Sequence, residues 1–156
     1  MKTITDIKPQ IKNKTRCSIF LDNAYYCGLE LETVMRNRLK IGMGIDEDRL
    51  EKIQEESERS RALDKALGFI ARSKKTEKQI GEYLAGKGYL PATIAYVMNK
   101  LKEYNFVSDS DYAEDYVGAH STNKGKRLLK LELMRKGVSE KDMGTALDSL
   151  KDESEN

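Results

Sequence analysis

The sequence has 156 residues, of which 35% are charged, yet its formal net charge is only +2. Basic and acidic surpluses alternate along the chain, which excludes a uniformly basic coat for nucleic acid. No stretch approaches the ~20 apolar residues of a membrane span, and the N-terminus lacks the apolar core of a signal peptide, so we expect a cytoplasmic protein without membrane contact.

Residues 1–45 are predicted to form a β-rich extension. Ile4–Ile11 and Cys17–Leu29 show the rough alternation of strands. Asp22 and Asn23 tolerate the left-handed backbone that a tight hairpin turn requires. The sequence therefore predicts a hairpin or a three-stranded meander.

A two-residue turn would pair Cys17 with Gly28 and Cys27 with Ser18. The two cysteines are then expected on opposite faces, as reduced, half-buried residues without a disulfide. With His120 as the only histidine, they do not complete a zinc site.

A short helix is predicted over Glu30–Arg38, with Leu31, Val34 and Met35 on one face. Residues 40–44 contain two glycines and are expected to be a loop.

Residues 46–60 are predicted to be an acidic helical connector. They contain no proline or glycine, and an acidic start favours a helix N-terminus. Because Ser57 and Ser60 fall at inward positions, we expect this helix to be solvated, and either to continue into the next segment or to break near Ser60.

The rest of the chain contains one pattern twice. Thr76–Leu101 superimposes without a gap on Lys124–Leu150 after a shift of 49 residues. The matching apolar pairs are Ile80 with Leu129, Leu84 with Leu133, Ile94 with Met143, Val97 with Ala146, Met98 with Leu147 and Leu101 with Leu150. The same shift pairs Leu63 and Leu67 upstream with Tyr112 and Tyr116, which predicts core roles for these tyrosines. A period of this length is typical of an array of one supersecondary unit.

Each repeat is predicted to hold three short helices, over residues 61–107 and 108–151, followed by an acidic tail at 152–156. Thr76 nearly forms a capping box, Pro91 suits a first helical turn, and Ser139 suits an N-cap. Gly88 and Gly137 are expected to stop the second helix of each repeat. The predicted fold class is therefore mainly α, with tandem three-helix, helix-turn-helix-like repeats and a small N-terminal β-hairpin or meander.

Basic residues recur at the repeat spacing and define a predicted basic ridge. Three pairs recur, Lys75 with Lys124, Lys78 with Arg127 and Lys87 with Lys136, and the ridge also includes the surrounding cations Lys74, Lys126, Lys130 and Arg135. Such a ridge can follow phosphates or an acidic protein partner. The alternative is an ordinary solvated helix surface.

The sequence offers no catalytic constellation. It lacks a nucleophile elbow and a glycine-rich nucleotide loop, and the acidic run 109–115 suits a helix start better than a calcium loop. We therefore expect no enzyme activity, no cofactor and no metal.

Residues 62–150 resemble the RecX family of bacterial regulators of the RecA recombinase. The matching elements are Ala66-Leu67, Glu77, Leu84, Lys87-Gly88-Tyr89, Asp109, Tyr112-Ala113, Gly125, Glu132-Leu133 and Lys136-Gly137. The N-terminal hairpin is similar to the β extension of longer family members.

The resemblance implies a monomer, without catalytic residues, that lies along the groove of the RecA nucleoprotein filament. It implies inhibition of RecA in DNA repair, recombination and the SOS response, with or without contact to single- or double-stranded DNA. Family members usually carry three such units, whereas two are expected here. The alternatives are a small helix-turn-helix-like DNA-binding protein and a helical adaptor for another partner.

Overall fold

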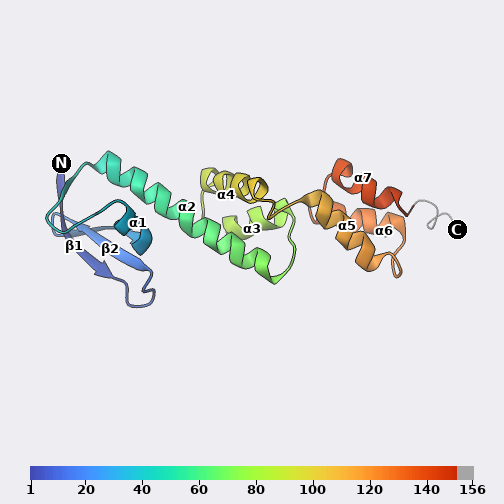
Figure 1. Ribbon diagram of the computed structural model, residues 1–156, viewed down its shortest axis with the longest axis horizontal. Coiled ribbons are helices and arrows are strands. Elements are labelled where there is room, and N and C mark those ends of the chain that lie inside the picture. The colour runs from blue at the N-terminus through green and yellow to red at the C-terminus, as the bar shows by residue number, and fades with distance from the viewer. Residues whose placement is uncertain (151–156) are drawn as a thin grey trace. The chain divides into compact units, whose positions relative to one another are not determined.

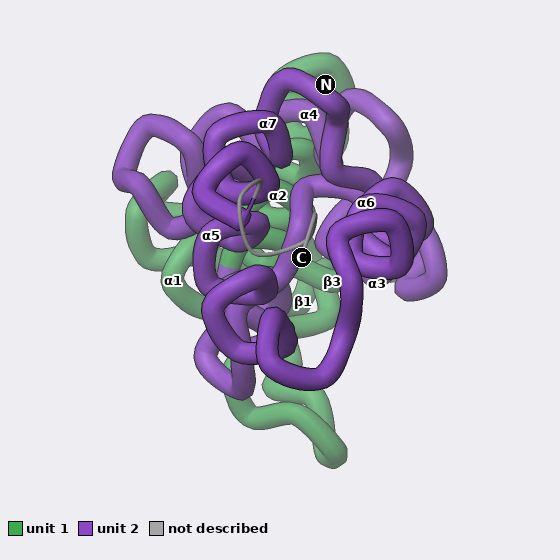
Figure 2. Tube along the Cα trace, turned by 90° about the vertical axis from the view of Figure 1, so that its right-hand side faces the viewer, with its two compact units in different colours: residues 1–63 green, residues 64–156 purple. Residues whose placement is uncertain are grey.

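The structure, a computed structural model, describes residues 1–150, so the predicted acidic tail at 152–156 lies outside the described residues. The chain divides into two units, residues 1–63 and residues from 64 onward (Figure 2). Figure 1 shows the helices and strands coloured by residue number along the chain. The elements in chain order are β1 (Lys2–Pro9), β2 (Arg16–Leu21), β3 (Ala24–Glu30), α1 (Leu31–Arg36), β4 (Gly44–Ile45), α2 (Glu47–Arg72), α3 (Glu77–Gly86), α4 (Pro91–Glu103), α5 (Asp109–His120), α6 (Lys126–Arg135) and α7 (Glu140–Asp148). This mainly helical fold with an N-terminal sheet confirms the predicted class. No helix within the described part is long and apolar enough to cross a membrane.

The N-terminal sheet is antiparallel, with strand order β3-β2-β1-β4. Asp22 and Asn23 form the predicted hairpin turn, with φ angles of 47° and 69°. Strand β4 was not predicted, because two residues cannot show an alternating pattern. It pairs Gly44 and Ile45 with the start of β1, so the segment expected to be only a loop also closes the sheet.

The predicted placement of the cysteines on opposite faces is wrong. The register between β2 and β3 shifts at Ile19/Phe20, so that Cys17 pairs with Leu29 and Ile19 pairs with Cys27. The bulge adds one residue to β3, so the part of β3 beyond the bulge presents its side chains on the opposite face from the one predicted. Both cysteines therefore face the same core, where they are buried as free thiols. Burial raises the pKa of the Cys27 thiol to about 11.

The apolar face predicted for the short helix is only partly right, since Val34 alone of its three residues is buried. In α1 the buried residues are Thr33 and Val34, whereas Leu31 is 41% exposed and Met35 is 69% exposed. A helix of six residues has fewer than two turns, so periodicity does not fix its orientation. The preceding strand, which runs directly into α1, sets it instead.

Helix α2 runs unbroken from Glu47 to Arg72, and the inward face of its first half is buried rather than solvated. Leu50 and Ile53 belong to the core beneath the sheet, and Ser57 is fully buried. The Ser57 hydroxyl oxygen accepts a hydrogen bond of 2.8 Å from the backbone N–H of Glu30. A polar residue at an inward position thus satisfies a donor at the end of β3.

Replacing Ser57 with alanine is expected to lower the free energy of unfolding by about 1–3 kcal/mol, because a part-buried backbone donor loses its partner. Urea unfolding followed by circular dichroism measures this change. Ser60→Ala, on the same helix at a half-buried position, is the control and should have a smaller effect. Equal effects of the two substitutions would contradict the role assigned to Ser57.

The burial pattern of the second and third helices confirms the 49-residue repeat. In α3 and α6 the fully buried pairs are Ile80 with Leu129 and Leu84 with Leu133. The predicted capping box at Thr76 and the predicted N-cap at Ser139 are present as well. These short helices are therefore stabilised by packing within each three-helix repeat.

The upstream extension of that shift is not followed in the first helix of each repeat. Ala66 in α2 and Val117 in α5 are buried, and they are 51 positions apart rather than 49. Leu67 is half-buried, and Tyr112 and Tyr116 pack at the margin of the second core. Comparing the two repeats without a gap gives the wrong pairing in the first helix, because the connection between the first and second helices differs in length between the repeats.

Candidate partner-binding groove between the repeats

The N-terminus of α3 joins the first repeat to the second. The Thr76 hydroxyl donates a hydrogen bond of 2.5 Å to the backbone carbonyl of Lys136, and its oxygen accepts one from the N–H of Gln79. Beside it, the N–H of Glu77 donates to the Asp109 carboxylate at 2.9 Å. Because Thr76 and Asp109 are buried, these bonds are shielded from water and fix the joint.

Asp109 keeps its carboxylate inside this joint. Burial raises the pKa of the Asp109 carboxyl, while the N–H of Glu77 partly opposes that rise. The Glu77 side chain forms an ion pair of 2.6 Å with Lys102 of α4. The joint therefore links α3, α4 and α5 through one helix start.

Gly137 lets the two repeats approach closely. Its φ angle is +97°, and a Cβ at this position would lie 2.4 Å from the Cβ of Lys78. Gly88, its counterpart in the first repeat, has a φ angle of +93° but open space around it. Gly88 and Gly137 both end the second helix of their repeat, but only Gly137 also contacts the other repeat.

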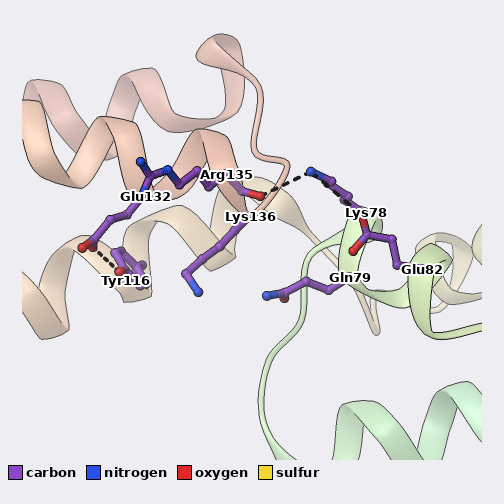
Figure 3. A pocket seen from close by; sticks show the side chains of 7 residues that line it. All are labelled: Lys78, Gln79, Glu82, Tyr116, Glu132, Arg135 and Lys136. Carbon is purple, nitrogen blue, oxygen red and sulfur yellow. Dashed lines mark hydrogen bonds and ion pairs between the residues drawn. The ribbon is translucent and has the colours of Figure 1, made fainter. Parts of the chain in front are cut away.

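A groove of about 440 Å³ lies beside this joint, between α3 of the first repeat and α5 and α6 of the second (Figure 3). Its lining residues are Lys78, Gln79, Glu82, Tyr116, Glu132, Arg135 and Lys136. The Lys78 ammonium group is 3.4 Å from the backbone carbonyl of Arg135 and 3.9 Å from the Glu82 carboxylate. Basic residues from both repeats, Lys78, Arg135 and Lys136, therefore line one hollow together with two carboxylates.

The wall of the groove formed by the second repeat contains a hydrogen-bonded network of polar side chains. The Tyr116 hydroxyl donates to the Glu132 carboxylate, and the Lys124 ammonium group donates to both carboxylate oxygens at 2.9 Å. The ammonium groups of Lys124 and Lys136 lie 5.8 Å and 5.6 Å from the centre of the Tyr116 ring. Glu132 is thus neutralised locally, which leaves the groove positively charged and suited to carboxylates or phosphates.

This hydrogen-bonded network makes the contribution of Glu132 to stability depend on pH. The hydrogen bonds from Tyr116 and then from Lys124 lower the pKa of the Glu132 carboxyl below its usual 4.5. A lowered folded-state pKa means that the stabilisation is present above pH 4.5 and is lost as the pH falls through the lowered value. Glu132→Gln should therefore destabilise the protein at neutral pH, and its difference from wild type should shrink in stronger acid. Urea unfolding over that range measures this, and a constant difference would refute it.

The ten predicted ridge residues do not form one continuous line along the structure. Lys78, Arg135 and Lys136 line the groove, and Lys124 supports its wall. Lys74 pairs with Asp115, and Lys75 lies 4.6 Å from the centre of the Phe69 ring, beside a separate small hollow. The others lie elsewhere: Lys87 near the Tyr83 ring, and Lys126, Arg127 and Lys130 on α6, where Lys130 is 3.4 Å from Glu140.

Sequence reasoning missed four lining residues. Tyr116 was assigned to the core alone, although it both packs against the core and lines the groove. Gln79 and Glu82 carry no signal, because polar residues on a helix surface are common. For Glu132 a signal was present: it replaces Tyr83 at the repeat spacing and faces Lys124.

The fold and the groove together define a tandem three-helix-repeat protein with a basic cleft between its repeats. Family models match three segments: the regulatory protein RecX N-terminal domain at residues 2–46, the first RecX three-helix domain at 62–101 and the second at 108–147. The chain belongs to the RecX family of regulatory proteins.

Named relatives and solved structures agree with this assignment. A regulatory protein RecX of Clostridium botulinum is 32% identical over 99% of this chain and 73% of its own length. One of Clostridium tetani is 36% identical over 88% of this chain, which spans 63% of that relative's length. A crystal structure of regulatory protein RecX, 25% identical, superimposes with a TM-score of 0.70 over 96% of this chain and 74% of the other.

Proposed function

We propose that this protein is a non-enzymatic regulator of RecA that binds along the groove of the RecA–DNA filament and lowers its activity. The protein would then act as a monomer in the cytoplasm, in DNA repair and recombination. The two repeats, taken as 61–107 and 108–151, are the proposed binding units. Family membership and the resemblance to RecA regulators support the partner.

The observation that carries this proposal is the presence of Lys78, Arg135 and Lys136, from two repeats, in the lining of one groove. A filament of protein and DNA presents both carboxylates and phosphates, and each is recognised by cations of this kind. The fixed joint at Thr76 holds cations from two repeats in one arrangement before a partner arrives. Such preorganisation lowers the entropic cost of binding.

The test is a titration of the purified chain into RecA assembled on single-stranded DNA, with ATP hydrolysis as the readout. We expect hydrolysis to fall as the chain is added, and strand exchange and repressor cleavage to fall with it. An absence of any effect on all three would refute the proposal. A salt-dependent shift of bare duplex without RecA would instead favour the helix-turn-helix-like DNA-binding protein.

A further inference from the structure

Helix α6 has apolar side chains on two opposite sides. Leu129 and Leu133 are fully buried in the second core. Leu128, Leu131 and Met134, three residues apart, point outward and are 44%, 45% and 48% exposed. A surface helix normally has one apolar stripe, facing its core. We call Leu128, Leu131 and Met134 the outer stripe.

The first repeat provides an internal comparison for this stripe. At the repeat spacing, the outer positions of α3 are Gln79, Glu82 and Ala85, whereas its inner positions, Ile80 and Leu84, are apolar and fully buried. Gln79 and Glu82 line the groove beside the second repeat. Both repeats form the same three-helix unit, and only in the second are leucines exposed on the outer face of the second helix. The outer stripe is not required by the fold of the unit, which makes a binding role the better explanation.

Cations are interleaved with the outer stripe. Arg127 and Arg135 are exposed on the same side of α6, and Lys130 lies next to Leu131 along the helix. The one acidic residue of α6, Glu132, is already bound by Tyr116 and Lys124. Leucine and methionine beside arginine resemble the centre of a protein–protein interface. The exposed Glu140 carboxylate lies 3.4 Å from Lys130, so Arg127 and Arg135 are the cations better placed to pair with a partner.

We propose that the outer face of α6 binds an acidic, amphipathic segment of a partner protein. Apolar side chains at helical spacing in that segment would cover the stripe, and flanking carboxylates would pair with Arg127, Lys130 and Arg135. This surface is distinct in composition from the groove, which it adjoins at Arg135. The inference holds whether or not RecA supplies the segment.

Other occupants satisfy fewer of these features. Nucleic acid would pair with the cations and leave three apolar side chains uncovered. A second copy packed through the same face would bring its own Arg127 and Arg135 near those of the first. A lipid surface is bound by helices with a longer apolar face than this ten-residue helix presents.

The experiment uses the full chain and a labelled helical peptide of about 18 residues, with leucine at every third or fourth position and glutamate between, followed by fluorescence anisotropy. Leu128→Gln/Leu131→Gln/Met134→Ala gives α6 the outward polarity of α3 without changing its charge. This variant is expected to weaken peptide binding by about tenfold or more. Arg127→Gln/Lys130→Gln should weaken it at low salt and by less at high salt.

Undiminished peptide binding by the stripe variant would overturn the proposal. So would stripe-dependent binding of anionic phosphatidylglycerol vesicles in preference to the peptide, or a wild-type dimer that the stripe variant abolishes in sedimentation. Circular dichroism checks that the variants keep wild-type helicity. If the stripe variant unfolds, the single substitution Leu131→Gln serves in its place, and the same outcomes apply. The RecA titration is a separate measurement, so failure of one proposal is distinguishable from failure of the other.

Discussion

Gly137→Ala is expected to destabilise the protein strongly, by about 2–5 kcal/mol. An alanine in the left-handed region costs about 1–2 kcal/mol by itself. In addition, its Cβ would lie 2.4 Å from the Cβ of Lys78, so that one backbone must move. Overpacking of this kind adds about 1–3 kcal/mol. Urea unfolding followed by circular dichroism measures the loss.

Gly88→Ala is the matched control for this substitution. It has the same helix-stop position and nearly the same φ angle, but no atom lies within 4 Å of an added Cβ. Only the conformational cost of about 1–2 kcal/mol is expected there. The difference between the two variants therefore isolates the contact between the repeats. Equal losses would mean that the two repeats do not touch at Gly137.

Charge reversal in the groove is expected to have the largest effect on partner binding. Arg135→Glu/Lys136→Glu would turn two of the three basic residues that line it into anions. If the groove binds carboxylates or phosphates, affinity for the RecA–DNA filament should fall by at least about tenfold. Co-sedimentation with the filament measures this, and the loss should be greatest at low salt.

The control for this variant is Arg72→Glu/Lys141→Glu, which changes the net charge equally. Both residues are exposed and lie outside the predicted ridge and the groove. This control should retain most of the wild-type affinity. If the two double variants bind alike, the filament senses overall charge and the groove has no special role.

The repeats were predictable because their information is local. The side chains of Thr76 and Ser139 accept hydrogen bonds from N–H groups of their own helices, so these caps are visible in the sequence. The 49-residue spacing of Ile80 and Leu129 needed only the chain's comparison with itself. Where a feature depends on neighbours within a few residues, sequence reasoning succeeded.

The failures in the N-terminal unit share one cause. One bulge residue places the two cysteines on the same face of the sheet rather than on opposite faces. No local sequence pattern predicts the position of a bulge. Ser57 looked solvated because its partner, the N–H of Glu30, is 27 residues away in the sequence. Such features are decided by packing rather than by periodicity.

The groove itself was beyond sequence reasoning. The predicted ridge contains Lys78, Arg135 and Lys136, but nothing in the sequence separates them from Lys87 or Lys126 as groove residues. Their presence in one groove depends on the joint at Thr76, which connects residues 60 positions apart. The role of this groove in binding stays a prediction.

The joint holds the second repeat by its main chain. Thr76 and Lys78 donate to the backbone carbonyls of Lys136 and Arg135, and not to their side chains. A substitution at either carbonyl-bearing position therefore leaves the acceptor in place. Those two side chains can therefore change without loss of the joint, so the spacing between the repeats does not depend on the residues that we propose to bind the partner.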